Sequence, residues 1–173
     1  MPQLRLTAKM AKELKILELK NLNNCTALYD DWYVDVVRIL RKKIFIFMHI
    51  HTRIALAIPS YEIGGIHNLF KCFPLLINEF LHLLNYGKIA NESYDFFSCP
   101  QSQFNFVKTN DKSTLRYVSD FKLILEITAE KYQKISQLLC DNTSERWLER
   151  LIKDNSQINA YTTPLKLLKK LLD

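Results

Sequence analysis

The residues from Phe104 to Arg116 combine basic, acidic and hydroxyl side chains where the pattern of the chain changes. Alternating apolar residues predict a strand up to Lys108, and helical periodicity begins after the polar run Thr109–Ser113. Because free amides at a helix start can bind an anion, the junction is a candidate site for a phosphate or carboxylate. The candidate ligand-binding residues are Lys108, Asn110, Asp111, Lys112, Ser113 and Arg116.

A purely structural role explains the same residues. Asn110 or Asp111 would cap the helix, and Ser113 would bind a free amide of its first turn. Asp111 would also repel an anion at the helix start. A third interpretation is a small hydrolase or nuclease centred on Asp111 and Asp120, which requires the two carboxylates to converge in a concave site.

Histidines and cysteines offer weaker candidates for chemistry. His49 and His51 project from the same face of a predicted strand, but no third metal ligand follows at a supporting spacing. We therefore expect water-exposed histidines and no metal site. The four cysteines are widely spaced, which favours free thiols in a reducing cytoplasm: Cys25, Cys72, Cys99 and Cys140.

Glycine is scarce, with three residues in 173. Neither a Walker loop nor a Rossmann fingerprint can be assembled, which excludes nucleotide-hydrolysing and dinucleotide-dependent enzymes of those types. The serine-hydrolase elbow and the zincin signature are also absent from the sequence. We expect no cofactor.

The positive charge is concentrated in the first third of the chain. The formal net charge is +6, and residues 1–53 hold ten Lys/Arg against five Asp/Glu, whereas the remainder holds fourteen against thirteen. This asymmetry is compatible with a surface for nucleic acid or another polyanion, and also with an ordinary basic domain.

Length and hydropathy indicate a single soluble domain, residues 1–173. The longest apolar region, Ile44–Ile58, is interrupted by His49, His51 and Arg53, and no signal-peptide core is present near Leu4. We expect no membrane association and a cytoplasmic location.

The predicted fold class is α+β, with a mainly antiparallel sheet of about four to five strands covered by helices. Segments rich in β-branched and aromatic side chains predict an antiparallel meander of three strands, Trp32–Leu40, Ile44–His51 and Ile54–Ile58, with Arg41-Lys42-Lys43 as its first turn. Two further strands are predicted at Gln3–Leu6 and Gln103–Lys108.

Helical periodicity and capping residues predict the remaining elements. A first helix is capped by Thr7 and ends near Leu19, and a second runs from Ile66 to a Gly87 C-cap, with Pro74 kinking or splitting it. A short helix at Glu92–Ser98 and a long one from Asp111 towards Cys140 follow. Ser144 caps a further helix, and Thr163-Pro164 starts the last one, Leu165–Leu172. Residues 141–173 would form a helical C-terminal extension. Its apolar residues, Trp147, Leu148, Leu151, Leu165, Leu168 and Leu172, would pack on a protein partner, on a second copy, or on their own domain.

Several of these segments together resemble a family of small bacterial cytoplasmic proteins of unknown function. The resemblance rests on Leu4–Lys9, Lys12–Leu14, Asp31–Tyr33, Lys108–Leu115 and Asp120-Phe121, and covers about residues 3–126. This chain departs from the family pattern at Arg116, at Ser119 and at His49–His51. The resemblance implies a bacterial cytoplasmic origin and supplies no activity.

Taken together, these features favour a non-catalytic binding or regulatory module, whose ligand is an anionic molecule, a nucleic acid or a protein partner. The small hydrolase or nuclease is the alternative.

Overall fold

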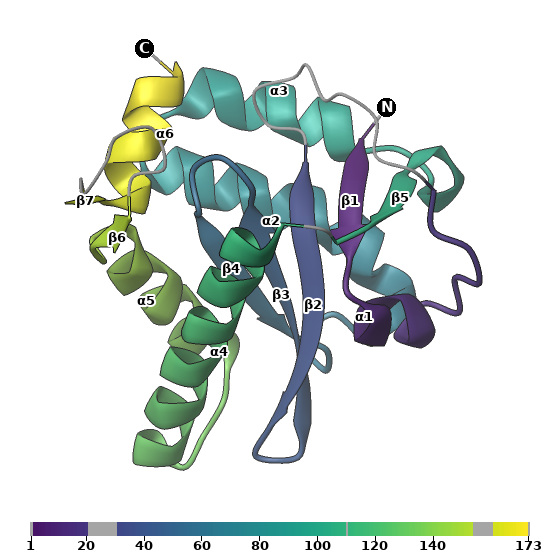
Figure 1. Cartoon of the computed structure of the whole chain (residues 1–173), viewed down its shortest axis with the longest axis horizontal. Coiled ribbons are helices and arrows are strands. Elements are labelled where there is room, and N and C mark those ends of the chain that lie inside the picture. The colour runs from purple at the N-terminus through teal and green to yellow at the C-terminus, as the bar shows by residue number, and fades with distance from the viewer. Residues whose placement is uncertain (1, 21–30, 110, 154–160, 173) are drawn as a thin grey trace.

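A five-stranded mixed sheet forms the centre of the computed structural model, which describes residues 2–20, 31–109, 111–153 and 161–172 (Figure 1). The strand order is β4-β3-β2-β1-β5. The strands are β1 (Gln3–Leu6), β2 (Trp32–Ile39), β3 (Lys42–His49), β4 (Ala55–Pro59) and β5 (Asn105–Lys108). The predicted α+β class is therefore confirmed.

The predicted antiparallel meander is confirmed as β2–β3–β4. Trp32 pairs with His49 at one end of the β2–β3 ladder, and Ile39 pairs with Lys42 at the other. Leu40 and Arg41 both have positive φ, 48° and 65°, as a two-residue hairpin turn with the right-handed twist requires. The turn thus lies slightly before the predicted Arg41-Lys42-Lys43, whose two lysines begin β3.

The outer part of the sheet is parallel, which explains its mixed character. β1 runs parallel to β2 and to β5, with Arg5 opposite Tyr33 on one side and opposite Val107 on the other. β1 and β5 are distant in the sequence, and β1 lies between two strands that follow it along the chain.

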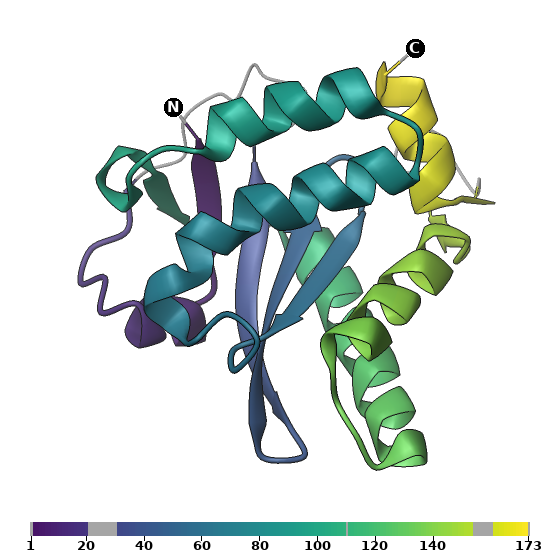
Figure 2. The same cartoon turned by 180° about the vertical axis from the view of Figure 1, so that it is seen from behind.

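Helices cover both faces of the sheet (Figures 1 and 2). α2 (Leu69–Leu83) and α3 (Gly87–Phe97) lie against the face that carries Trp32, Val34, Phe45 and Phe47. α4 (Lys112–Tyr132) and α5 (Gln137–Leu148) lie against the opposite face, which carries Tyr33, Ile44, Ile46 and Met48. The alternating strand pattern therefore supplies two hydrophobic cores, one on each face.

Two helices end earlier than their apolar pattern predicts. Thr7 caps α1 (Ala8–Glu13) by accepting a hydrogen bond from the Met10 amide at 3.2 Å, as predicted, but the helix stops at Glu13 rather than near Leu19. Lys15 has φ of 57°, and the chain then runs to β5, where the Lys20 amide donates to the Phe106 carbonyl. The long helix predicted towards Cys140 is likewise divided at Gln133, which adopts the left-handed conformation between α4 and α5.

Two other capping predictions, for Gly87 and Ser144, are wrong, and of the two effects predicted for Pro74 the split of the helix is not found. Gly87 begins α3, because α2 ends at Leu83 and Asn85 supplies the left-handed residue. Pro74 is buried within a continuous α2 and does not split it. Ser144 lies inside α5, where its hydroxyl donates to the Cys140 carbonyl, so it caps no helix.

The C-terminal elements pack on the rest of the molecule. Trp147 of α5 is buried and its Nε1 donates to the Arg53 carbonyl at 2.7 Å. A short ribbon of β6 (Ile152–Lys153) and β7 (Tyr161–Thr162) precedes α6 (Pro164–Leu172), which starts at the predicted proline and buries Leu168. Among the described residues, none of the helices is both long and apolar enough to cross a membrane.

Candidate functional site

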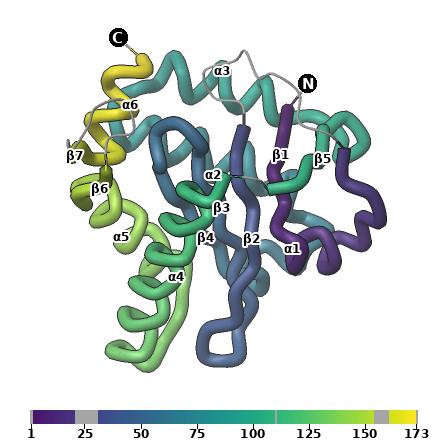
Figure 3. The backbone as a smooth tube through the Cα atoms, viewed as in Figure 1, coloured from purple at the N-terminus to yellow at the C-terminus, as the bar shows by residue number. Residues whose placement is uncertain are grey.

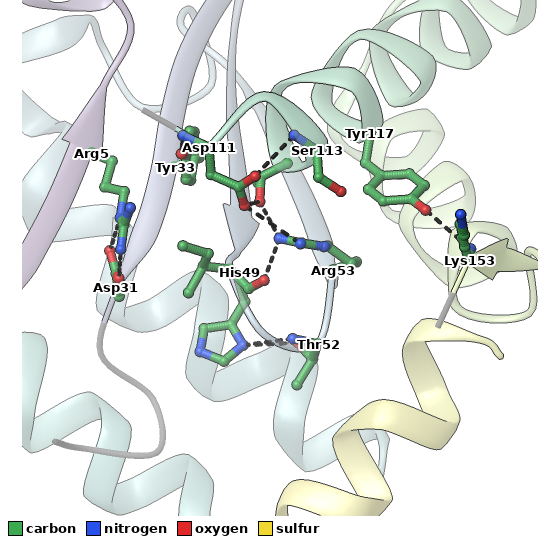
Figure 4. Close-up of polar contacts among 12 residues, drawn as sticks. Arg5, Asp31, Tyr33, His49, Thr52, Arg53, Asp111, Ser113, Tyr117 and Lys153 are labelled. Atoms are coloured by element: carbon green, nitrogen blue, oxygen red, sulfur yellow. Dashed lines mark hydrogen bonds and ion pairs between the residues drawn. The ribbon is translucent and has the colours of Figure 1, made fainter. Parts of the chain in front are cut away.

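Asp111 caps α4, as the structural interpretation of the junction predicts. Its carboxylate accepts hydrogen bonds from the Ser113 amide at 2.9 Å and from the Thr114 hydroxyl, and its own amide donates to the Tyr33 hydroxyl at 2.8 Å (Figure 4). Burial raises the pKa of Asp111, but the hydrogen bonds from Thr114 and Ser113 and the charge of Arg53 outweigh it, so the pKa lies below its usual value. The carboxylate is therefore ionised at the helix start.

Arg53 is the centre of the contacts around this cap. The sequence marks Arg53 only as an interruption of an apolar run and does not predict it as a site residue. Its guanidinium donates to the Ile50 carbonyl and to the Thr114 hydroxyl, and Nη2 lies 3.5 Å from Asp111 Oδ2. Burial lowers the pKa of Arg53, and the charge of Asp111 opposes that shift. A lone arginine in an apolar run is itself a signal, since a buried charge requires a partner.

A second buried ion pair lies beside the first. Arg5 of β1 forms a two-bonded pair with Asp31, and both side chains are almost fully buried. Burial lowers the pKa of Arg5, and the bond and charge of Asp31 outweigh it, so the pKa is raised. Tyr33 links the two pairs, because its ring lies under the Arg5 guanidinium at 5.6 Å and its hydroxyl meets the Asp111 amide.

The two histidines of the β3 end have different environments. His49 is 3% exposed, and its Nδ1 lies 2.9 Å from the Thr52 hydroxyl, so the expectation that it faces water is wrong. His51 is exposed, and burial of part of its ring lowers its pKa. Within the described chain, no group of three or more His, Cys, Asp or Glu side chains is arranged to hold a metal ion.

The cations of the predicted anion site remain on the surface. Lys108 ends β5, Lys112 begins α4 and Arg116 lies one turn further, and all three are exposed. None of them forms an ion pair with another described residue. Asn110 lies outside the described residues. The structure therefore brings Asp111 and Ser113 together as a cap, with Lys108, Lys112 and Arg116 available to solvent around it.

Asp111 and Asp120 do not form a pair of catalytic carboxylates. Nine residues of α-helix correspond to about 13 Å of rise and two and a half turns, so the two side chains lie on opposite sides of α4. Asp120 is instead 3.6 Å from the Arg150 guanidinium, beyond the end of α5. These positions give no support to the hydrolase or nuclease alternative.

The cysteine thiols and a small cavity do not add a reactive site. Burial raises the pKa of the Cys140 thiol to about 12, and burial also raises those of Cys72 and Cys99; Cys25 lies outside the described residues. A cavity of about 30 Å³ between Trp32, His49 and α6 is large enough for about one water molecule.

Three of the five segments that carry the family resemblance meet at this cluster. Leu4–Lys9 supplies Arg5, Asp31–Tyr33 supplies Asp31 and Tyr33, and Lys108–Leu115 supplies Asp111, Ser113 and Thr114 (Figure 4). A search of the curated proteins gave no match. A family model does match, and it spans residues 3–167, well past residue 126 and through α5 into α6. The chain therefore belongs to the family described as domain of unknown function DUF6933.

Proposed function

We propose that this protein is a non-catalytic binding module that recognises a polyanion, such as a nucleic-acid backbone, through a basic surface on α1 and the β2–β3 hairpin. We call this the hairpin surface and define it as Lys9, Arg38, Arg41, Lys42 and Lys43. The observation that carries the proposal is the gathering of three of these cations, Lys9, Arg38 and Lys43, around one carboxylate, that of Glu13.

Contacts with Glu13 bring three of these cations close together. Lys43 Nζ lies 2.6 Å from Glu13 Oε2, and the charges of Lys43, Arg38 and Lys9 all help to lower the pKa of Glu13 below its usual value. Arg38 pairs with Lys43 across the β2–β3 ladder. Arg41 belongs to the tip of this hairpin, since Ile39 and Lys42 are the last pair of the ladder. The tip extends past α1 (Figure 3).

The exposure of most cations in residues 1–53 supports the same proposal. Of the ten Lys/Arg in residues 1–53, Arg5 and Arg53 are buried in ion pairs and Lys43 pairs with Glu13, while the other seven are exposed. Exposed cations bind a phosphate backbone by displacing its condensed counterions, whatever the base sequence. The bacterial cytoplasmic origin that the family resemblance implies would place nucleic acid within reach.

Titration of fluorescently labelled duplex and single-stranded DNA and RNA at several salt concentrations tests the proposal. Wild-type protein should bind at low salt and lose affinity steeply as salt rises. The triple variant Arg38→Gln, Arg41→Gln, Lys42→Gln should weaken binding at least tenfold and reduce the slope of log affinity against log salt by about two to three, since each phosphate contact contributes about 0.9 on duplex DNA.

A matched control removes three other exposed cations, as Lys108→Gln, Lys112→Gln, Arg116→Gln. Its net charge equals that of the first triple variant, so an effect of total charge would weaken both variants equally. We expect the control to retain affinity within about threefold. Equal losses in the two variants would move the surface away from the hairpin, and no binding at low salt would refute the proposal.

A further inference from the structure

An apolar and acidic groove, opposite in charge to the basic hairpin surface, lies between α2, α5 and the edge strand β4. Its volume is about 430 Å³, within the range of binding sites. α2 and α5 flank β4 (Figure 2), and apolar side chains from all three elements line the groove, including Leu56 of β4, Leu76 and Phe80 of α2 and Leu138 of α5. We call it the α2–α5 groove.

Apolar surface continues onto the rim of the groove. Leu75, Leu83 and Leu138 line it and are 49%, 69% and 70% exposed. Leucines exposed to this extent around a concave apolar floor are typical of surfaces that pack against another molecule.

The charge of the groove is entirely negative. Glu62, Glu79, Asp141 and Glu145 line it, and no lysine, arginine or histidine is among its described lining residues. Burial, followed by the charges of Glu79 and Glu145, raises the pKa of Asp141 against the hydrogen bond that it accepts from Gln137. Like charges therefore repel one another here, in a chain whose formal net charge is +6, and a bound cation would relieve that repulsion.

The floor of the groove favours a helix over an added strand. Gln137 of α5 donates to the Ala57 carbonyl of β4 at 3.2 Å, so α5 already occupies part of the free edge, and Pro59 offers no amide. The second polar atom of that side chain, Gln137 Oε1, is buried and has no hydrogen-bond partner among the described residues. A groove between two helices is a common docking site for a third.

We propose that the α2–α5 groove docks an amphipathic helix of a partner protein, one that carries lysine or arginine beside its apolar face. The leucines of the groove would bury the apolar stripe of the helix, and its cations would meet the four carboxylates. This interaction is separate from polyanion binding by the hairpin surface, so either one can fail without the other.

A second copy of the chain is not the occupant. α6 has the required composition, with Lys166, Lys169 and Lys170 among leucines. However, Leu168 is buried in the chain's own core, and the half-buried Leu171 and Leu172 line the cavity beside it. Leaving that position would expose these residues to water, so the cation-bearing helix must come from another protein.

Three synthetic peptides of about 18 residues test the proposal. They share one stripe of leucines at helical spacing and differ only in the flanking residues, which are lysine, glutamine or glutamate. By fluorescence anisotropy at low salt, the lysine peptide should bind the full-length protein at least tenfold more tightly than the glutamate peptide, with the glutamine peptide between them.

Variants locate the binding. The triple variant Glu79→Gln, Asp141→Asn, Glu145→Gln, and separately Leu138→Asp, should each weaken the lysine peptide at least tenfold, whereas Glu18→Gln, Glu126→Gln, Glu130→Gln removes three exposed carboxylates elsewhere and should change affinity less than threefold. Circular dichroism and thermal melts confirm folding of each variant. The proposal would be overturned if the wild type did not bind, or if both triple variants lost equal affinity. It would also be overturned if Leu138→Asp still bound fully, which would indicate a small polycation as the ligand. If the wild type dimerised in sedimentation and Leu138→Asp abolished the dimer, a second copy would be the occupant instead.

Discussion

At the scale of single residues, buried charges hold the start of α4 against the sheet. Arg53 and Asp111 lie on a turn and on a helix cap, and each satisfies hydrogen-bonding groups that would otherwise be buried without partners. Lys122 of α4 reaches the buried Asp35 of β2 in the same way. Removing one member of such a pair costs more than the pair itself contributes, because the other charge stays buried.

Two substitutions at Asp111 separate its roles as cap and as counter-ion. Asp111→Asn keeps a good cap but loses the charge that faces Arg53, and should lower the free energy of unfolding by about 1 kcal/mol. Asp111→Ala loses both and should lower it by about 2–3 kcal/mol. Urea denaturation measures both, with Lys112→Ala as a control that should change stability by less than about 0.5 kcal/mol. Asp111→Ala as mild as the control would contradict the assigned roles.

The lowered pKa of Asp111 gives the same carboxylate a defined pH dependence. Since the folded pKa lies below that of the unfolded chain, about 3.9, the stabilisation is complete above the unfolded value and is lost as pH falls through the folded one. The difference in unfolding free energy between wild type and Asp111→Asn should therefore be constant above about pH 5 and shrink below about pH 4. A difference that grows on acidification would show that the shift has the opposite sign.

At the scale of elements, residues with positive φ end the helices where the apolar pattern continues. Lys15, Asn85 and Gln133 have φ of 57°, 65° and 46°. The left-handed conformation is uncommon outside glycine, so it appears where packing of the next element compensates its cost. Asn85 lies in the turn between α2 and α3, and Gln133 lies in the turn between α4 and α5.

Replacing Gln133 with glycine should stabilise the protein by about 0.5–1 kcal/mol, because relief of left-handed strain exceeds the entropy that glycine loses on folding. Thermal and urea unfolding both measure this change. Lys131→Gly, in the last turn of α4, is the matched control and should destabilise by about 0.5–1 kcal/mol. If both substitutions destabilise equally, the left-handed turn carries no strain.

At the scale of the whole molecule, the sheet separates two hydrophobic cores, and each contains one tryptophan. Trp32 lies in the core under α2 and α3, and Trp147 lies in the core under α4 and α5. These are the two tryptophans of the chain. Each can therefore report on the unfolding of one face.

Single-tryptophan variants test the prediction that residues 1–173 form one domain. In Trp32→Phe the remaining fluorescence reports on the α4–α5 face, and in Trp147→Phe on the α2–α3 face. In each variant, fluorescence and far-UV circular dichroism should give the same urea midpoint, as a two-state domain requires. If Trp147 fluorescence changed at a lower urea concentration than the circular dichroism, the C-terminal helices would form a separate unit.

Local sequence patterns are sufficient to predict the strands of the meander, the two N-caps and the start of α6. Alternation over residues 32–58 sets the two faces of a strand, and the caps at Thr7 and Asp111 need only a hydrogen bond to an amide two or three residues away. All of these are local effects, which a short stretch of chain contains completely.

The position of β1 between β2 and β5 follows only from tertiary packing, as do the ion pairs of Arg5 with Asp31 and of Arg53 with Asp111. The same holds for the helix ends at Lys15, Asn85 and Gln133 and for the acidic groove between α2 and α5. Which carboxylate neutralises a buried arginine, and which helix covers a strand edge, depends on segments that are distant along the chain. No local pattern contains that information, because the free energy that selects it is gained only when the distant elements pack together.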